Sequence, residues 1–240
     1  MKVIIIAGGL GTRIAEETED KPKPMVLINN KPIIWHLMNI FCLQGLSDFI
    51  ISSGYKSEII ENWVQSNEIF DSNSNGMKIS VINTGLHTQT GGRISEVMKS
   101  VPGERVIATY GDGLANVSIK NLLNFHVSHG KLASITAVRP PARFGHIEIE
   151  NNKVIHFGEK NQSDVGWING GFFVLEPEVS SYVKSLNEPF ETGALTNLTL
   201  NSELMAYQHF GYWQPMDTLR EKLDLENQAK LENPPWLKFN

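Results

Sequence analysis

Residues 2–13 read KVIIIAGGLGTR, and this stretch decides the fold. Val3 to Ile6 form a short β-branched run that stops at glycines, which is the pattern of a buried parallel strand entering a loop. Glycines at that point let backbone N–H groups turn toward an anion without a Cβ clash, and the guanidinium of Arg13 suits phosphate oxygens. The stretch predicts a phosphate-binding turn at a strand end. The alternative is a plain strand-to-loop turn with a surface arginine.

Two common nucleotide-binding motifs do not fit this turn. The dinucleotide motif G-x-G-x-x-G needs a third glycine, which is missing here. The P-loop needs four residues between its glycines and then Lys-Ser or Lys-Thr, which are also missing. A Rossmann oxidoreductase is therefore disfavoured.

Strand-like and helix-like segments alternate along the rest of the chain, which predicts an α/β fold with a doubly wound, mostly parallel sheet. We expect strands at residues 48–52, 78–82, 105–109, 132–138 and 203–207, and helices at 31–44, 56–65, 93–99, 118–130 and 217–231. Residues 144–157 alternate around Asn151-Asn152 instead, which predicts an antiparallel hairpin that joins the sheet. Because no repeat or linker is visible, we expect residues 1–240 to form a single domain.

Composition narrows the class of protein. The net charge of −5 disfavours a nucleic-acid-binding surface, which is usually basic. The apolar run at the start is too short for a signal peptide, and no stretch approaches about 18 uninterrupted apolar residues. The single cysteine, Cys42, excludes an internal disulfide. We therefore expect a cytoplasmic protein that binds neither nucleic acid nor membrane.

A second basic segment, KPKPM at residues 21–25, follows the glycine turn. Two lysines separated by proline cannot lie inside a regular helix. Proline holds the local chain extended, so this segment can aim a lysine at a fixed point. The alternative is a solvated proline loop.

Two aspartates are candidates for chemistry. Asp112 follows the strand at 105–109 between two glycines, so its carboxylate lies at the carboxyl end of a parallel strand, where open α/β sheets bind ligands. Magnesium is usually held by one or two carboxylates together with phosphates and water, which suits Asp112. The alternative for Asp112 is a simple Asp-Gly turn. Asp217 precedes Thr-Leu-Arg, and from the residues alone it is predicted to cap the following helix.

His126 and His129 lie three residues apart on the helix expected at 118–130, a spacing that could suit a metal. No third ligand is close in the sequence. We therefore expect both histidines on the surface near the end of the helix.

The chain also carries an ordered series of motifs. After GGLGTR and KPKPM come TGGR at 90–93, TYGDG at 109–113, HGK at 129–131, PPARFG at 140–145, WINGGFF at 167–173 and WQPMDT at 213–218. The series runs in order from Lys2 to about Trp236 and resembles the glucose-1-phosphate cytidylyltransferase family of sugar-phosphate nucleotidylyltransferases.

The resemblance implies a Rossmann-like nucleotidyltransferase fold. It also implies an enzyme that transfers the cytidylyl group of CTP to a sugar 1-phosphate, with glucose 1-phosphate as the expected acceptor, and that releases pyrophosphate. It implies Mg²⁺ held by Asp112 and Asp217, with Arg13, Lys23 and Asp112 as catalytic residues. We also expect a homo-oligomer. The implied nucleotide contacts are Ala7, Gly8, Gly9, Gly11, Thr12, Arg13, Thr88, Gly92, Arg93, Gly111 and Asp112. The implied acceptor contacts are Gly145, Glu159, Lys160, Asn169 and Gly170.

Three departures from the family pattern leave the acceptor open. The segment before TGGR is shortened to DSNSNG at 71–76, Asn161 replaces the usual proline, and residues 191–195 read ETGAL where the family carries a further glutamate and a proline. A non-glucose or non-sugar phosphorylated acceptor is one alternative. A catalytically silent nucleotide-sugar-binding homologue is another, against which the retention of Arg13, Lys23 and both aspartates argues.

Overall fold

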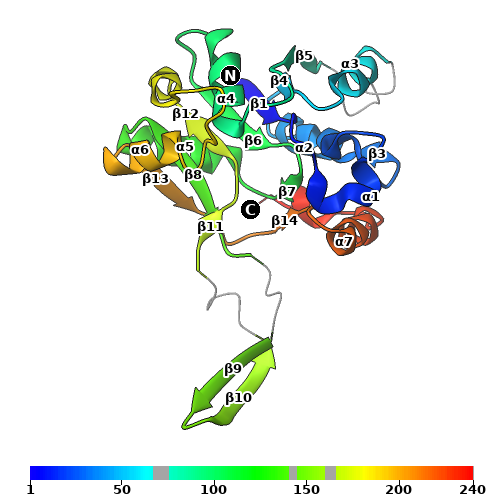
Figure 1. Cartoon of the computed structure of the whole chain (residues 1–240), viewed down its shortest axis with the longest axis vertical. Coiled ribbons are helices and arrows are strands. Elements are labelled where there is room, and N and C mark those ends of the chain that lie inside the picture. The colour runs from blue at the N-terminus through cyan, green and yellow to red at the C-terminus, as the bar shows by residue number, and fades with distance from the viewer. Residues whose placement is uncertain (67–75, 141–144, 160–165, 240) are drawn as a thin grey trace.

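The computed structural model, drawn in Figure 1, describes residues 1–66, 76–140, 145–159 and 166–239. An eight-stranded sheet forms its centre, with the order β11-β8-β12-β6-β1-β4-β5 and with β13 paired to β8. The strands are β1 (Lys2–Ile6), β4 (Asp48–Ser53), β5 (Lys78–Asn83), β6 (Val106–Tyr110), β8 (Ala133–Val138), β11 (Ile168–Asn169), β12 (Phe173–Leu175) and β13 (Leu204–Gln208). β5, β4, β1 and β6 run parallel, as does β13 beside β8. The predicted mostly parallel α/β sheet is confirmed.

Helices cover both faces of this sheet, as a doubly wound fold requires. Along β1, Val3 and Ile5 belong to one buried cluster and Ile4 and Ile6 to another, because successive side chains of a strand point to opposite faces. The first cluster is closed by α2 (Ile33–Cys42), α3 (Ser57–Gln65), α5 (Ile119–His129) and α7 (Leu219–Ala229). The second is closed by α4 (Thr90–Lys99) and α6 (Ala194–Leu200). Among the described residues, none of these helices is long and apolar enough to cross a membrane.

The antiparallel part of the sheet differs from the prediction. The hairpin of β9 (Gly145–Glu150) and β10 (Lys153–Glu159) does form around Asn151 and Asn152, both with positive φ, but it is a separate two-stranded sheet. The prediction that it joins the main sheet is wrong. The antiparallel strands of the main sheet are β11, which pairs with β8 at the edge, and β12, which lies between β6 and β8. Each is short, and β12 has three residues. Its three residues are fully buried and were too few to show a strand pattern.

Helix α4 begins at Thr90, three residues before the predicted start, so Gly91 and Gly92 lie inside its first turn. Glycine pairs usually interrupt helices, but here they allow close packing. A Cβ atom at Gly91 would lie 2.6 Å from the Glu188 carbonyl oxygen, and one at Gly92 would lie 2.3 Å from the Leu186 carbonyl oxygen. By contrast, α5 follows the prediction, since Ser118 caps its start and Gly130 ends it with φ 62.

Short elements complete the chain. They are η1 (Thr12–Ile14), α1 (Ala15–Thr18), η2 (Lys23–Met25), β2 (Leu27–Ile28), β3 (Lys31–Pro32), β7 (Gly113–Ala115), η5 (Pro177–Tyr182), β14 (Trp213–Pro215) and η6 (Pro235–Leu237). Of these, η2, β7 and β14 position the site described below.

The prediction that both histidines of α5 lie on the surface is wrong for His126, whose residue is 1% exposed. Its Nε2 lies 3.1 Å from Glu176 Oε1 and its Nδ1 lies 2.9 Å from Ser134 Oγ. The same hydroxyl lies 2.7 Å from His129 Nε2, and the Lys131 backbone N–H donates to His129 Nδ1 at 2.9 Å. Only one proton arrangement satisfies every bond of this histidine chain with both rings neutral. His129 donates to Ser134, Ser134 donates to His126, and His126 donates to Glu176.

This histidine chain makes stability depend on pH. Burial lowers the pKa of His126 and of His129 below the ordinary value of 6.5. The unfolded chain therefore binds these protons first, so the stabilisation is full above pH 6.5 and is lost as pH falls through the folded pKa values. We expect the thermal midpoint to fall between about pH 7 and pH 5, and to fall less steeply in the double variant His126→Gln/His129→Gln.

Differential scanning calorimetry across this range measures the effect. His36 and His209 are also buried and have lowered pKa values. They account for the dependence of the thermal midpoint on pH that remains in the double variant. Equal slopes for the wild type and the double variant would contradict the role of the histidine chain.

Candidate active site

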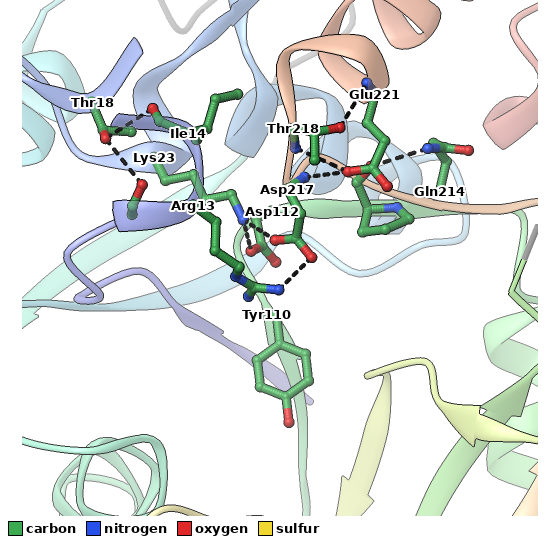
Figure 2. A network of polar contacts seen from close by, with 12 residues as sticks. Arg13, Ile14, Thr18, Lys23, Tyr110, Asp112, Gln214, Asp217, Thr218 and Glu221 are labelled. Carbon is green, nitrogen blue, oxygen red and sulfur yellow. Dashed lines mark hydrogen bonds and ion pairs between the residues drawn. The ribbon is translucent and has the colours of Figure 1, made fainter. Parts of the chain in front are cut away.

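Four charged side chains from distant parts of the chain meet at the carboxyl end of the central strands (Figure 2). Lys23 Nζ lies 2.5 Å from Asp112 Oδ2 and 2.6 Å from Asp217 Oδ1. Arg13 contacts the other oxygen of Asp217 at 2.6 Å. Positive and negative groups therefore alternate, and two carboxylates face one cationic nitrogen. We call these four residues the charge cluster.

Lys23 is held in place by the prolines on both sides of it. Pro22 is extended with ψ 149, and Pro24 lies in the first turn of η2. Both prolines are buried, and the Met25 N–H donates to the Pro22 carbonyl at 2.8 Å. The Lys23 side chain is only 8% exposed, so the alternative of a solvated proline loop is wrong.

The two aspartates are brought together by a small ladder outside the main sheet. β7 follows Asp112 directly, and β14 ends two residues before Asp217. The two strands pair antiparallel, with Pro215 opposite Gly113. One step further, the Met216 N–H donates to the Asp112 carbonyl at 2.9 Å. This ladder explains how residues so far apart in sequence share one site, which residue patterns did not indicate because each strand has only three residues.

The prediction that Asp217 caps the last helix is wrong. Thr218 is the N-cap of α7 and accepts a hydrogen bond from the Glu221 N–H at 3.2 Å. The Glu221 carboxylate accepts in return from the backbone N–H groups of Thr218 and Asp217. This capping box satisfies the helix terminus, so the Asp217 carboxylate can face Lys23 and Arg13.

The glycine turn after β1 is open to solvent at Gly9, Thr12 and Arg13. On its buried side the turn is hydrogen-bonded to Arg93. The Arg93 guanidinium is buried and donates to the Gly8 carbonyl at 2.9 Å and to the Ser53 carbonyl at 2.8 Å. A Cβ atom at Gly8 would lie 2.1 Å from the Arg93 guanidinium, so any larger residue there would displace this guanidinium from its bonds. Burial lowers the pKa of Arg93 from its ordinary value.

The structure therefore assembles only part of the predicted nucleotide set. Ala7, Gly8, Gly9, Gly11, Thr12 and Arg13 share the turn after β1, and Gly111 and Asp112 follow the neighbouring strand β6. The other three are bonded or packed within the protein. Arg93 lies beneath the turn, Thr88 donates to the Thr84 carbonyl, and Gly92 packs against Leu186.

The predicted acceptor residues fall into two groups. Asn169 and Gly170 lie at β11, where Trp213 Nε1 donates to the Gly170 carbonyl at 2.9 Å. Gly145 and Glu159 face each other at the open end of the hairpin. Lys160 lies outside the described residues.

Sequence reasoning missed the partners of Asn169. Asn169 Nδ2 donates to the Tyr110 hydroxyl at 3.0 Å, and that hydroxyl donates to Glu191 at 2.5 Å. Tyr110 stands directly before the Gly111-Asp112 pair in the TYGDG motif, and this position was the one signal that could have identified it.

The charge cluster is also where a metal ion could bind. Its two carboxylates already face a common cation, and carboxylate oxygens are ligands that Mg²⁺ prefers. Within the described ranges, no group of three or more His, Cys, Asp or Glu side chains could hold a metal ion. An ion at Asp112 and Asp217 would thus complete its coordination with phosphate oxygens and water.

Comparisons with known proteins show the family to which the chain belongs. The nucleotidyl transferase family model matches residues 2–218. The chain is 42% identical over 253 residues to the glucose-1-phosphate cytidylyltransferase of Salmonella typhi, with 98% of each chain covered. It is 31% identical over 193 residues to the D-glycero-alpha-D-manno-heptose 1-phosphate guanylyltransferase of Aneurinibacillus thermoaerophilus, covering 79% of this chain and 80% of that one.

A solved structure shares the fold. The crystal structure of HddC from Yersinia pseudotuberculosis complexed with GMP-PN has a TM-score of 0.72 at 24% identity, covering 95% of this chain and 99% of that chain. The Salmonella relative matches over nearly the full length and carries the family assignment. The chain is a nucleotidyltransferase and belongs to the glucose-1-phosphate cytidylyltransferase family.

Proposed function

We propose that the protein transfers the cytidylyl group of CTP to glucose 1-phosphate, forming CDP-glucose and pyrophosphate. The observation that carries this proposal is the charge cluster, which lies beside the glycine turn in a chain 42% identical to a glucose-1-phosphate cytidylyltransferase. The choice of cytosine and of glucose rests on that relative. The expected homo-oligomer and cytoplasmic location stay predictions.

The reaction needs charge neutralisation more than it needs a base. The second pKa of the acceptor phosphate is near 6, so at neutral pH its oxygen is an anionic nucleophile that needs no proton removed. That oxygen bonds to the α-phosphorus of CTP, and the bond from the α-phosphorus to the bridging oxygen breaks. Pyrophosphate leaves with the electron pair. Two anions must approach each other, so catalysis consists of in-line positioning and electrostatic stabilisation.

Lys23 and Arg13 suit different parts of this task. The Lys23 ammonium is buried and fixed by two prolines, so it supplies a positive charge at one defined point. The Arg13 side chain is 71% exposed, so its guanidinium is open to an incoming triphosphate and suits the leaving pyrophosphate. Between them, the N–H groups of the glycine turn suit the remaining phosphate oxygens.

Asp112 and Asp217 suit a magnesium ion that joins the nucleotide to the protein. The ladder of β7 and β14 already holds the two carboxylates around one cationic atom, so they fit a divalent cation without a change of backbone. When bound, magnesium would neutralise phosphate charge. The residues proposed for the acceptor are Gly145, Glu159, Lys160, Asn169 and Gly170, and Thr88, Gly92 and Arg93 are proposed to support the nucleotide.

A substrate panel tests the proposed function directly. Each of the four ribonucleoside triphosphates is incubated with magnesium and with glucose 1-phosphate, another sugar 1-phosphate or a phosphorylated polyol. We expect pyrophosphate release with CTP and glucose 1-phosphate, and a product with the mass of CDP-glucose. Release with a polyol phosphate alone would identify a non-sugar acceptor. No release from any pair would identify a silent homologue.

Asp112→Asn tests the carboxylate of the charge cluster. The amide keeps the shape of the side chain but loses the charge, so we expect kcat to fall by roughly 10²-fold or more. The matched control is Asp224→Asn, at an exposed position of α7, which should keep wild-type kcat. Near-normal turnover of Asp112→Asn at limiting magnesium would remove Asp112 from the mechanism.

Lys23→Met tests the metal site without measuring activity. Without the ammonium, Asp112 and Asp217 face each other as like charges, so we expect a lower melting temperature in the absence of divalent cations. Magnesium should then raise the melting temperature more in this variant than in the wild type, because the ion replaces the lost charge. Calorimetry with and without magnesium measures both shifts. A variant that does not respond to magnesium would argue against a metal at the two aspartates.

A further inference from the structure

A hydrogen-bonded chain leads from the strand that carries Asp112 toward the predicted acceptor residues. Tyr110 ends β6, and in Figure 2 its hydroxyl points away from the carboxylates of the charge cluster. That hydroxyl donates to Glu191 Oε1 at 2.5 Å and accepts from Asn169 Nδ2 at 3.0 Å. The Tyr110 ring packs edge-on against Phe173 with 5.8 Å between centroids. Packing therefore fixes the ring while the hydroxyl joins two polar side chains.

The carboxamide of Asn169 is held at both ends. Its nitrogen donates to Tyr110, and its oxygen accepts from the Gly171 N–H at 2.9 Å. A flipped amide would place its NH₂ group against that N–H, so only one orientation satisfies both bonds. In this orientation the amide still has a second N–H and a second oxygen lone pair beyond these two bonds.

Glu191 is anchored on its other side as well. Thr90 Oγ1 donates to Glu191 Oε2 at 2.8 Å, and the Phe190 N–H donates to Thr90 Oγ1 at 2.8 Å. Glu191 is exposed, and each of its oxygens has a further lone pair. We call Thr90, Glu191, Tyr110 and Asn169 the acceptor network.

The chemistry of its members fixes the direction of the bonds in the acceptor network. The Glu191 carboxylate can only accept, so the Tyr110 phenol donates its proton to Glu191. Its oxygen is then left to accept from Asn169. Without the hydroxyl, the Asn169 amide would lose one of its two anchors. A carboxylate and an amide held side by side are also groups that recognise sugar hydroxyls, which both donate and accept.

We propose that Tyr110 and Glu191 are positioning residues of the acceptor site, which hold the Asn169 carboxamide in the orientation that binds a hydroxyl of the sugar phosphate. This inference rests on the proposed function, in which the acceptor contacts Asn169. It also assigns a role to the glutamate of the ETGAL segment, at 191–195, where the chain departs from the family pattern. Only Gly111 separates Tyr110 from Asp112, so the network places the sugar beside the reacting phosphates.

Tyr110→Phe tests the inference because it removes one oxygen and keeps the ring. We expect the KM for glucose 1-phosphate to rise by roughly 5- to 10-fold, the loss of about one hydrogen bond, while the KM for CTP stays unchanged. The matched control is Tyr182→Phe, which also removes a hydroxyl that accepts from an asparagine, Asn201, at 3.2 Å. This control should keep the wild-type KM for both substrates.

Two substitutions at Glu191 separate positioning from simple packing. Glu191→Ala should raise the KM for glucose 1-phosphate as Tyr110→Phe does. Glu191→Gln should restore it, because the amide oxygen can accept from Tyr110 while its nitrogen donates to the Thr90 hydroxyl. The inference would be overturned if Tyr110→Phe left the KM for glucose 1-phosphate unchanged. It would also be overturned if this variant raised the KM for CTP as much as the KM for glucose 1-phosphate.

A binding measurement keeps the two proposals distinguishable. Calorimetric titration of glucose 1-phosphate into the wild type, Tyr110→Phe and Tyr182→Phe should show weaker binding only for Tyr110→Phe. If the wild type binds glucose 1-phosphate but releases no pyrophosphate, the proposed function fails and this comparison still decides the inference. If the wild type does not bind glucose 1-phosphate, the inference is overturned as well.

Discussion

The Lys23 ammonium is almost out of contact with water and lies between two carboxylates, and the arrangement of the site depends on this one contact. A charged group that leaves water is tolerated only when it is paired and hydrogen-bonded. Three local structures meet this requirement. Prolines fix the lysine, the ladder of β7 and β14 joins the segments that carry Asp112 and Asp217, and the capping box of α7 leaves the Asp217 carboxylate free.

Gly111 lies between two sets of polar groups, one that suits phosphates and one that suits hydroxyl groups. On one side, the charge cluster and the glycine turn present formal charges and backbone N–H groups, which suit phosphates. On the other side, the acceptor network presents an amide, a phenol and a carboxylate, which suit hydroxyl groups. A Cβ atom at Gly111 would lie 3.0 Å from the Ile6 carbonyl oxygen, so glycine lets the two strand ends approach this closely.

Local patterns were sufficient to predict the main strands, the turn after β1, the fixed position of Lys23 between prolines and the place of Asp112 at a strand end, because neighbours in the sequence determine these features. Tertiary contacts determined the features that could not be predicted. Gly91 and Gly92 lie in a helix because another backbone packs against them, and His126 is buried because Ser134 and Glu176 complete its bonds. The meeting of Asp112 and Asp217 follows from strands too short to leave a periodic pattern.

The late position of β14 has a consequence for how the protein matures on the ribosome. Every strand of the eight-stranded sheet precedes Trp213, so a nascent chain released up to this point already contains the whole sheet. Asp217 emerges only afterwards, with the strand that joins it to Asp112. The same segment carries α7, which closes one face of the sheet, so the second carboxylate and the last part of the core are acquired together.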